Sequence, residues 1–321
     1  MASSKSVVIA ALLANAAIAV LKFVGFLLTG SAAMLSETYH SVSDTGNQIF
    51  LLIGIRDSSR ERDRQHPFGY GKAQFFYSFL VSVLLFGIAG WESARHGIDR
   101  LTAAGTHTAP PEVVHFLWFS YRRPAWLDPV WVNYGVLIGA FVFEGWAFRR
   151  AYRTIAAEID ERGWSGLREA FRKTSDVSTL TALTEDAVAM SGAGIALLGV
   201  FLSEQTGDPR FDAAAAFLIG LLLMGFALAL ALENRRLLLG ESLPESRERE
   251  LRHIVAAHAG VEEIVDFRTV YFGTEQILVT ADVAFVPDLA TEEIDDLITD
   301  IEREIMAADS GIKKVYVEPE T

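Results

Sequence analysis

Two pairs of ionisable residues lie inside long apolar stretches of the chain, where charge is costly. His40 and Asp44 are four residues apart within Met34–Ile55, and Glu185 and Asp186 are adjacent within a second such stretch. Ionisable groups inside membrane spans are rare and usually act on an ion or a proton. Residues four apart share one face of a helix, and a histidine nitrogen beside a carboxylate oxygen suits a divalent transition metal. The pattern predicts a membrane transporter for a metal cation.

The composition predicts a membrane domain followed by an acidic domain outside the membrane. Of the 321 residues, 51% are hydrophobic, and the mean hydropathy of +0.27 indicates several spans. The segment from Glu241 onward carries most of the net charge of −13. We expect a transmembrane transport domain over 1–240 and a cytoplasmic domain over 241–321, and the acidic charge disfavours nucleic acid as a partner. The absence of cysteine excludes disulfides and thiolate metal sites.

Six apolar segments are long enough to cross a bilayer. The first follows Lys5 without a clear cleavage site, so we expect an uncleaved span rather than a signal peptide. A further apolar patch, Val113–Trp126, is interrupted by prolines, arginines and a histidine, and we expect an interfacial segment there. The expected spans are Val7–Leu28, Ala32–Ile55, Phe75–Ile98, Val130–Phe148, Ser178–Phe201 and Phe211–Leu232.

Basic residues concentrate in the loops on one side of these spans. Lysine and arginine are enriched in cytoplasmic loops, so both termini are expected in the cytoplasm, which agrees with an even number of spans. We expect a multi-pass protein of a bacterial inner membrane. The basic residues on the expected cytoplasmic side are Arg56, Arg60, Arg62, Arg64, Lys72, Arg149, Arg150, Arg153, Arg162, Arg168, Arg172, Lys173, Arg235 and Arg236.

The tail has the pattern of a small α+β module. Apolar residues recur at helical spacing over 244–258 and 291–306. Short apolar runs at 264–271, 277–285 and 313–317 predict strands. The predicted fold is therefore a membrane bundle of six helices followed by an αββαβ domain.

Two motifs and the domain order resemble one family of transporters. The run Glu37-Thr-Tyr-His-Ser-Val-Ser-Asp44 and the loop His66-Pro-Phe-Gly-Tyr-Gly-Lys72, with six spans, Lys22 in the first and an αββαβ tail, resemble the cation diffusion facilitator family. The resemblance covers nearly the whole chain. It implies homodimers, with a ferredoxin-like (metallochaperone-like) cytoplasmic domain, that export divalent metals, usually zinc, from the cytosol in exchange for protons. It also implies a transport site that joins two ligands of the second span, here His40 and Asp44, with two of the fifth.

The fifth span departs from most relatives, which carry His or Asp followed four residues later by Asp. Thr181 and Ala182 stand four before Glu185 and Asp186 and cannot replace a carboxylate. The adjacent pair resembles a branch of the family with Glu-Asp in this span. Neighbours on a helix point about 100° apart, so we expect Asp186 to bind metal directly with Glu185 close behind, although the pair could instead contact Lys22. More oxygen ligands shift the preference from zinc toward manganese or iron, so Mn²⁺ and Fe²⁺ stay open beside Zn²⁺.

A second metal site of some relatives lies in the loop after the second span. Asp63 and His66 match two of its positions, but Tyr70 stands where a further histidine would be, so we expect a weak site or none. The tail offers only His253 and His258 beside scattered acids, which predicts no tight zinc cluster there. We expect no cofactor beyond the transported metal.

Two other classes of function are alternatives to a metal/proton antiporter. A proton-coupled exporter of organic cations would also use buried acids, but it needs a roomy aromatic cavity rather than a His-x-x-x-Asp pair. An intramembrane metalloenzyme would need three protein ligands, an open water position and a general base. The chain lacks a His-Glu-x-x-His run, so we expect a transporter in contact with membrane lipid rather than an enzyme.

Overall fold

The protein divides into two compact units. The computed structural model describes residues 2–103, 113–116, 119–122, 129–162, 165–167, 177–274, 276–287 and 289–320. Residues 1–49 and 81–229 form the first unit, and residues 50–80 and 230–321 form the second. The domain boundary after residue 240 stays a prediction, and the expected basic residues Arg168, Arg172 and Lys173 lie outside the described residues.

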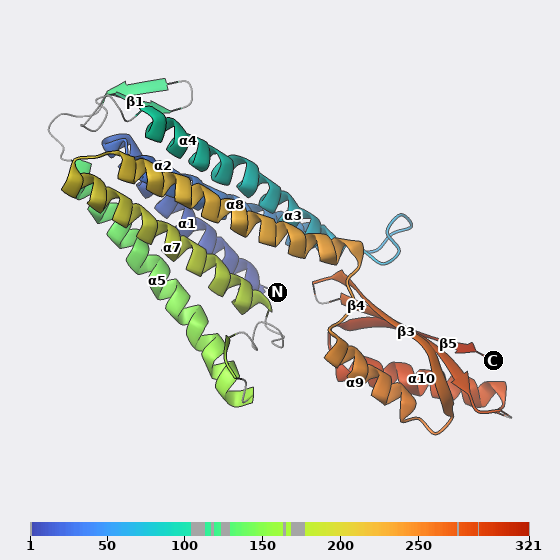
Figure 1. The fold of residues 1–321 in the computed structure, drawn as a ribbon. Helices are drawn as coiled ribbons and strands as arrows, with labels where there is room; N and C mark the ends of the chain where they lie inside the picture. The colour runs from blue at the N-terminus through green and yellow to red at the C-terminus, as the bar shows by residue number, and fades with distance from the viewer. Residues whose placement is uncertain are drawn as a thin grey trace. The chain divides into compact units, whose positions relative to one another are not determined.

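Long helices build the first unit, and each expected span falls on one of them (Figure 1). Three of these helices extend into the second unit at one end. A π-helical turn, η1, joins α3 to α4, so the third span is one continuous helix with a local bulge. The helices are α1 (Ala2–Thr29), α2 (Ala32–Ser58), α3 (Ala73–Leu84), η1 (Leu85–Gly90), α4 (Trp91–Ala103), α5 (Pro129–Arg162), α7 (Val177–Thr206) and α8 (Arg210–Leu239).

The helical membrane domain is confirmed. Among the described residues four helical stretches are long and apolar enough to cross a membrane: Ala73–Thr102, Val130–Glu161, Leu183–Thr206 and Arg210–Leu239. Asn15–Thr29 is a shorter apolar stretch. α2 is less hydrophobic than α1 because it carries the ionisable residues on which the functional prediction depends.

Glycines allow the backbones of α4 and α8 to approach closely. A Cβ atom added at Gly220 would lie 2.4 Å from the backbone nitrogen of Ala94, and one at Gly97 would lie 2.5 Å from that of Phe217. Membrane helices associate through such small residues, because lipid is as apolar as the side chains and close van der Waals packing replaces the hydrophobic effect.

Asp212 fixes the N-terminus of α2. Its carboxylate accepts hydrogen bonds from the Ser31 hydroxyl and from the backbone N–H of Ala32, both at 2.6 Å. The first N–H groups of a helix have no partner inside the helix, and an acid there also complements the helix dipole. Gly30, with φ of 70°, allows the tight link between α1 and α2. The start of α8 therefore holds the start of α2 in place.

The patch expected at the interface contains a short hairpin. β1 (Val113–Phe116) pairs antiparallel with β2 (Phe119–Arg122). The remaining residues of the predicted segment, 117–118 and 123–126, lie outside the described residues. An interfacial position for this hairpin stays a prediction.

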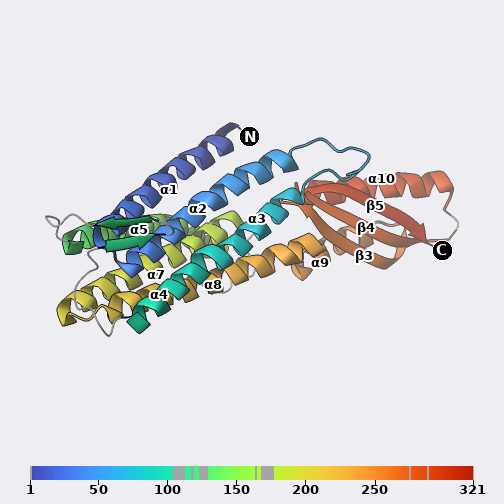
Figure 2. The same ribbon diagram turned by 90° about the horizontal axis from the view of Figure 1, so that it is seen from above.

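The C-terminal part of the second unit has the predicted αββαβ order. α9 (Glu245–Ala256) and α10 (Thr291–Ala308) cover one face of a sheet of β3 (Val261–Gly273), β4 (Gln276–Phe285) and β5 (Ile312–Glu320) (Figures 1 and 2). β3 and β4 are antiparallel, whereas β4 and β5 are parallel.

Alternation along β4 creates the core of this domain. Ile277, Val279, Ala281 and Val283 are buried every second residue, because successive strand side chains point to opposite faces. They pack in one cluster with apolar residues of α10 such as Ile301. The α+β part of the fold prediction is confirmed.

The close contact at Gly220 has a testable consequence, because Gly225 on the same helix has open space where its Cβ atom would be. Gly220→Ala should destabilise the protein by about 1–3 kcal/mol through overpacking against Ala94. Thermal unfolding in detergent would measure this. The matched control Gly225→Ala should be neutral or slightly stabilising, and equal behaviour of the two variants would contradict the packing argument.

Candidate functional site

His40 and Asp44 lie on one face of α2 and are removed from solvent. The His40 side chain is 1% exposed and that of Asp44 is 15% exposed. His40 Nδ1 lies 3.6 Å from Asp44 Oδ1, too far for a hydrogen bond. Neither ring nitrogen of His40 has a hydrogen-bond partner among the described residues. Buried polar groups without partners are costly and rare, so this imidazole is available to bind an ion.

The acidic pair of α7 lies beside this face of α2. The Asn47 side chain hydrogen-bonds Glu185, which also interacts electrostatically with His40 and Asp44. Asp186 interacts electrostatically with Asp44 as well as with Glu185. Glu185 is thus the member of the pair that is hydrogen-bonded to a side chain of α2. The sequence pattern instead favours Asp186 as the direct metal ligand. The assignment of all four residues as ligands stays a prediction.

Glu144 of α5 is a further acid near this group. It is partly buried and interacts electrostatically with His40 and Asp186. Glu144 is not among the residues predicted from the sequence, although it is the single acidic residue of the expected fourth span, Val130–Phe148. The argument applied to the other buried acids would have identified it.

A buried ion pair joins α1 to α2 close to the same group. Lys22 Nζ lies 2.8 Å from Glu37 Oε2, and both side chains are fully buried. Glu37 Oε1 has no hydrogen-bond partner among the described residues and lies 2.6 Å from the position that a Cβ atom at Gly192 of α7 would take. Lys22 also interacts electrostatically with Glu144 and Asp44. The lysine therefore pairs with Glu37 rather than with the acids of α7.

The ionisable groups are neighbours without forming one closed shell. Within the described part of the chain, no group of three or more histidine, aspartate or glutamate side chains is close enough to hold one metal ion. The residues of α2 and α7 interact through charge and through the Asn47–Glu185 hydrogen bond. Joint coordination of one ion would require these side chains to move closer together.

The loop after α2 uses Asp63 as a structural cap. Its carboxylate accepts hydrogen bonds from the Tyr70 hydroxyl at 2.6 Å and from the backbone N–H groups of Gln65 at 2.9 Å and His66 at 2.8 Å. These bonds, that of Tyr70 foremost, lower the pKa of Asp63 to about 2. A carboxylate whose pKa is lowered by folding stabilises the folded state at every pH above its pKa in the unfolded chain, which is about 4. This stabilisation is lost as pH falls from about 4 toward 2, so the loop should loosen only in that range.

Among the described residues, the two histidines of the tail belong to no cluster of three or more metal-ligating side chains. His253 is exposed on α9. Nδ1 of His258 lies 3.0 Å from the Ile254 carbonyl, and its Nε2 lies 3.9 Å from a carboxylate oxygen of Glu304. That this domain holds no tight zinc cluster stays a prediction.

Comparison with known proteins identifies the family. Residues 8–239 match the model of the cation efflux transmembrane domain, and residues 243–321 match that of the cation efflux protein cytoplasmic domain. The chain belongs to the cation efflux family. This confirms the resemblance to the cation diffusion facilitators, whereas the assignment to a Glu-Asp branch stays a prediction.

Relatives of this cation efflux protein come from several kingdoms. It is 29% identical over 87% of its length to the proton-coupled zinc antiporter SLC30A9, mitochondrial, of Xenopus laevis, and 25% identical over 88% to metal tolerance protein C4 of Arabidopsis thaliana. It is 24% identical over 99% of its length to the magnetosome protein MamM of Paramagnetospirillum magneticum. The chain spans 46% of the length of the antiporter, 57% of the plant protein and 88% of MamM.

The buried ion pair of this cation efflux protein predicts a stability effect. Lys22→Met should cost about 3–5 kcal/mol, because it leaves the Glu37 carboxylate buried without its counter-charge. Thermal unfolding in detergent would measure the loss. The double variant Lys22→Met/Glu37→Leu should recover most of it, since no uncompensated charge remains, and a double variant as unstable as the single one would contradict this explanation.

The loop geometry predicts what a histidine at residue 70 would add. The Tyr70 ring lies 4.2 Å from that of His66 between centroids, and its hydroxyl reaches Asp63. Tyr70→His should therefore add one bound Zn²⁺ per chain, because it brings a third ligand to Asp63 and His66. Isothermal titration calorimetry would measure the number of Zn²⁺ ions bound per chain. Tyr70→Phe, which lacks a ligand, is the matched control, and extra zinc in both variants would contradict the prediction.

Proposed function

We propose that this protein exports a divalent metal cation from the cytosol in exchange for protons, with His40 and Asp44 of α2 and Glu185 and Asp186 of α7 as ligands. The observation that supports it most is the buried His40 ring, whose two nitrogens have no hydrogen-bond partner among the described residues, one helical turn from Asp44. Imidazole and carboxylate together suit a transition-metal ion.

Charge balance at these residues links metal to protons. Asp44, Glu185, Asp186 and Glu144 interact with one another, while Lys22 is already paired with Glu37. Neighbouring carboxylates in a medium of low dielectric need cations close by. Metal ligands must also be deprotonated, so metal binding releases protons and protons displace metal. Alternate binding of metal on one side and protons on the other is antiport.

Zinc is the proposed substrate, with Mn²⁺ and Fe²⁺ as alternatives. The names of the mitochondrial relatives describe proton-coupled zinc antiporters. A site with one imidazole and several carboxylates is also compatible with manganese or iron, which prefer oxygen ligands more than zinc does. Flux assays with the three ions in competition would rank them.

The proposed setting follows from charge and domain order. The concentration of arginine and lysine in the loops after α2, α5 and α8 supports cytoplasmic termini, and we propose a bacterial inner membrane. The domain from residue 241 to the C-terminus is proposed to mediate homodimerisation, and the transport domain to occupy residues 1–240.

The alternative of organic-cation export has weaker support. It needs an aromatic cavity beside the buried acids, whereas one aromatic-lined cavity that the structure contains is built from residues of the second unit, not from His40 or Glu185. Transport of a test organic cation that Zn²⁺ does not inhibit would revive this alternative.

Transport in reconstituted vesicles tests the proposal. His40→Ala and Asp44→Ala should each lower Zn²⁺ flux at least about tenfold, since even loss of a residue that only orients a metal ligand costs on the order of 10–100-fold in affinity or activity. The combined replacement of His40, Asp44 and Asp186 by alanine should abolish flux. His253→Ala, at an exposed histidine of α9, is the matched control.

The pH dependence of the same assay tests the proton coupling. In vesicles loaded with Zn²⁺, an inward-directed proton gradient should accelerate Zn²⁺ efflux. Collapse of that gradient with an ionophore should remove the acceleration. A Zn²⁺ flux that does not depend on the proton gradient would reject antiport, but it would not contradict the proposal that the protein transports metal. Undiminished flux in the triple variant would reject the site.

A further inference from the structure

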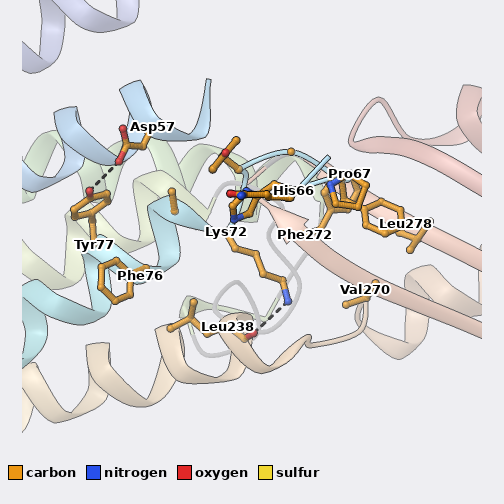
Figure 3. Close-up of a pocket in the computed structure, with 15 residues that line it drawn as sticks. Asp57, His66, Pro67, Lys72, Phe76, Tyr77, Leu238, Val270, Phe272 and Leu278 are labelled. Atoms are coloured by element: carbon orange, nitrogen blue, oxygen red, sulfur yellow. Dashed lines mark hydrogen bonds between the residues drawn. The ribbon is translucent and has the colours of Figure 1, made fainter. Parts of the chain in front are cut away.

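The second unit contains a cavity of about 650 Å³ that the transport proposal does not use (Figure 3). Its walls come from the end of α2, the loop before α3, the start of α3, the end of α8 and the strands β3 and β4. The volume is in the range of sites that bind small organic ligands.

The walls of this cavity are mainly apolar and partly open to solvent. Phe68 of the loop and Phe76 of α3 are 53% and 52% exposed, large values for phenylalanine. Val270, Phe272 and Leu278 form the wall on the sheet side (Figure 3). Exposed apolar surface that is concave and rimmed by polar groups marks a binding site.

The cavity lies at the ends of two membrane helices. The apolar span Ala73–Thr102 begins beside it with Ala73 and Phe76, and the span Arg210–Leu239 ends beside it with Leu238. Residues at the ends of spans of this length are expected at the level of the lipid headgroups. Aliphatic chains and charged headgroups of the adjoining leaflet are therefore the ligands present at high concentration.

Lys72 supplies a positive charge inside the cavity. Figure 3 shows its side chain extending between the apolar walls, where Nζ donates to the Leu238 carbonyl at 3.2 Å. An ammonium group has three N–H donors, so it can bind an anion while keeping this bond. Asp57, the acid of the wall, accepts a hydrogen bond from the Tyr77 hydroxyl at 2.8 Å.

The surrounding sequence adds to the positive charge. Arg56, Arg60, Arg62 and Arg64 lie in the helix end and loop that lead to the cavity, against Asp57, Glu61 and Asp63. The Asp63 carboxylate is engaged by Tyr70, over whose ring Arg60 lies at 4.4 Å. Basic clusters next to a span attract anionic lipids, and basic pockets between membrane helices bind their headgroups.

We propose that this cavity binds an anionic phospholipid of the adjoining leaflet, with one acyl chain between the phenylalanines and the phosphate at Lys72. The lipid would link the loop to the β3–β4 hairpin, which already touch: a Cβ atom at Gly71 would lie 2.4 Å from the Phe272 carbonyl oxygen. A bound lipid therefore stabilises the second unit. The proposal does not depend on which ion is transported.

Thermal unfolding of the full-length, delipidated protein in detergent tests the site. Added phosphatidylglycerol should raise the melting temperature, phosphatidylcholine should raise it less, and native mass spectrometry should show one retained phosphatidylglycerol per chain. Lys72→Gln should weaken the apparent affinity for phosphatidylglycerol about fivefold, the contribution of one basic residue at an anionic lipid surface.

A second variant fills the cavity without removing charge. Val270→Trp should abolish the stabilisation by phosphatidylglycerol, whereas Val265→Trp, at an exposed position of the same strand, should preserve it. Because both variants keep Lys72, a loss in Val270→Trp alone cannot come from altered charge. A melting temperature of Val270→Trp without lipid that equals the wild-type value would show that the variant folds.

Three results would overturn the proposal. Equal protection by phosphatidylcholine and phosphatidylglycerol would reject recognition of the anionic headgroup. Protection by oleate but not by phosphatidylglycerol would assign the cavity to a free fatty acid rather than to a bilayer lipid. Protection that survives in Val270→Trp would place the lipid elsewhere on the protein.

Discussion

The cost of charge in a medium of low dielectric constrains the whole membrane domain. Lys22 and Glu37 meet this cost directly, because both are fully buried and joined at 2.8 Å. His40, one turn further along α2, is equally buried but has no hydrogen-bond partner for its ring among the described residues. The same helix thus presents one charge that is compensated inside the protein and one polar group whose partner must come from elsewhere. Under the proposed function, a transported cation is this partner, which would account for both the burial and the absence of hydrogen bonds.

Packing determines where this helix lies. Asp212 at the start of α8 binds the first N–H groups of α2, and the glycines of α4 and α8 bring those two helices into backbone contact. Across α2, Gly192 leaves the space that the Glu37 carboxylate occupies against α7. These contacts are made by small residues and by caps rather than by long apolar side chains, as expected where lipid removes the hydrophobic driving force between helices. They hold α2 in place, with His40 close enough to Glu185 of α7 for the two side chains to interact electrostatically.

Much of this arrangement could be predicted from residue type and spacing, and the exceptions have physical reasons. The spans and the αββαβ tail follow from hydropathy and periodicity, and His40 and Asp44 from the cost of charge. Glu144 was not predicted because it stands alone in its span, whereas the prediction rested on pairs of ionisable residues; a single acid in a span carries the same cost. The pairing of Lys22 with Glu37, and the bond of Glu185 rather than Asp186 to Asn47, depend on how helices rotate against one another, which sequence spacing on one helix does not determine.

Two aspartates of this chain, Asp63 and Asp44, lie in contrasting environments. Asp63 is 47% exposed, and hydrogen bonds from Tyr70 and two backbone N–H groups satisfy its carboxylate, so its low pKa stabilises a loop and leaves little capacity for a metal. Asp44 is buried beside an imidazole at 3.6 Å and further acids. The binding free energy of a metal ion should be more favourable at Asp44 than at Asp63. At Asp44 the ion would supply a missing counter-charge, whereas at Asp63 it would have to break existing hydrogen bonds. Under the proposed function, the chain with tyrosine at residue 70 therefore binds metal inside the membrane rather than in the loop.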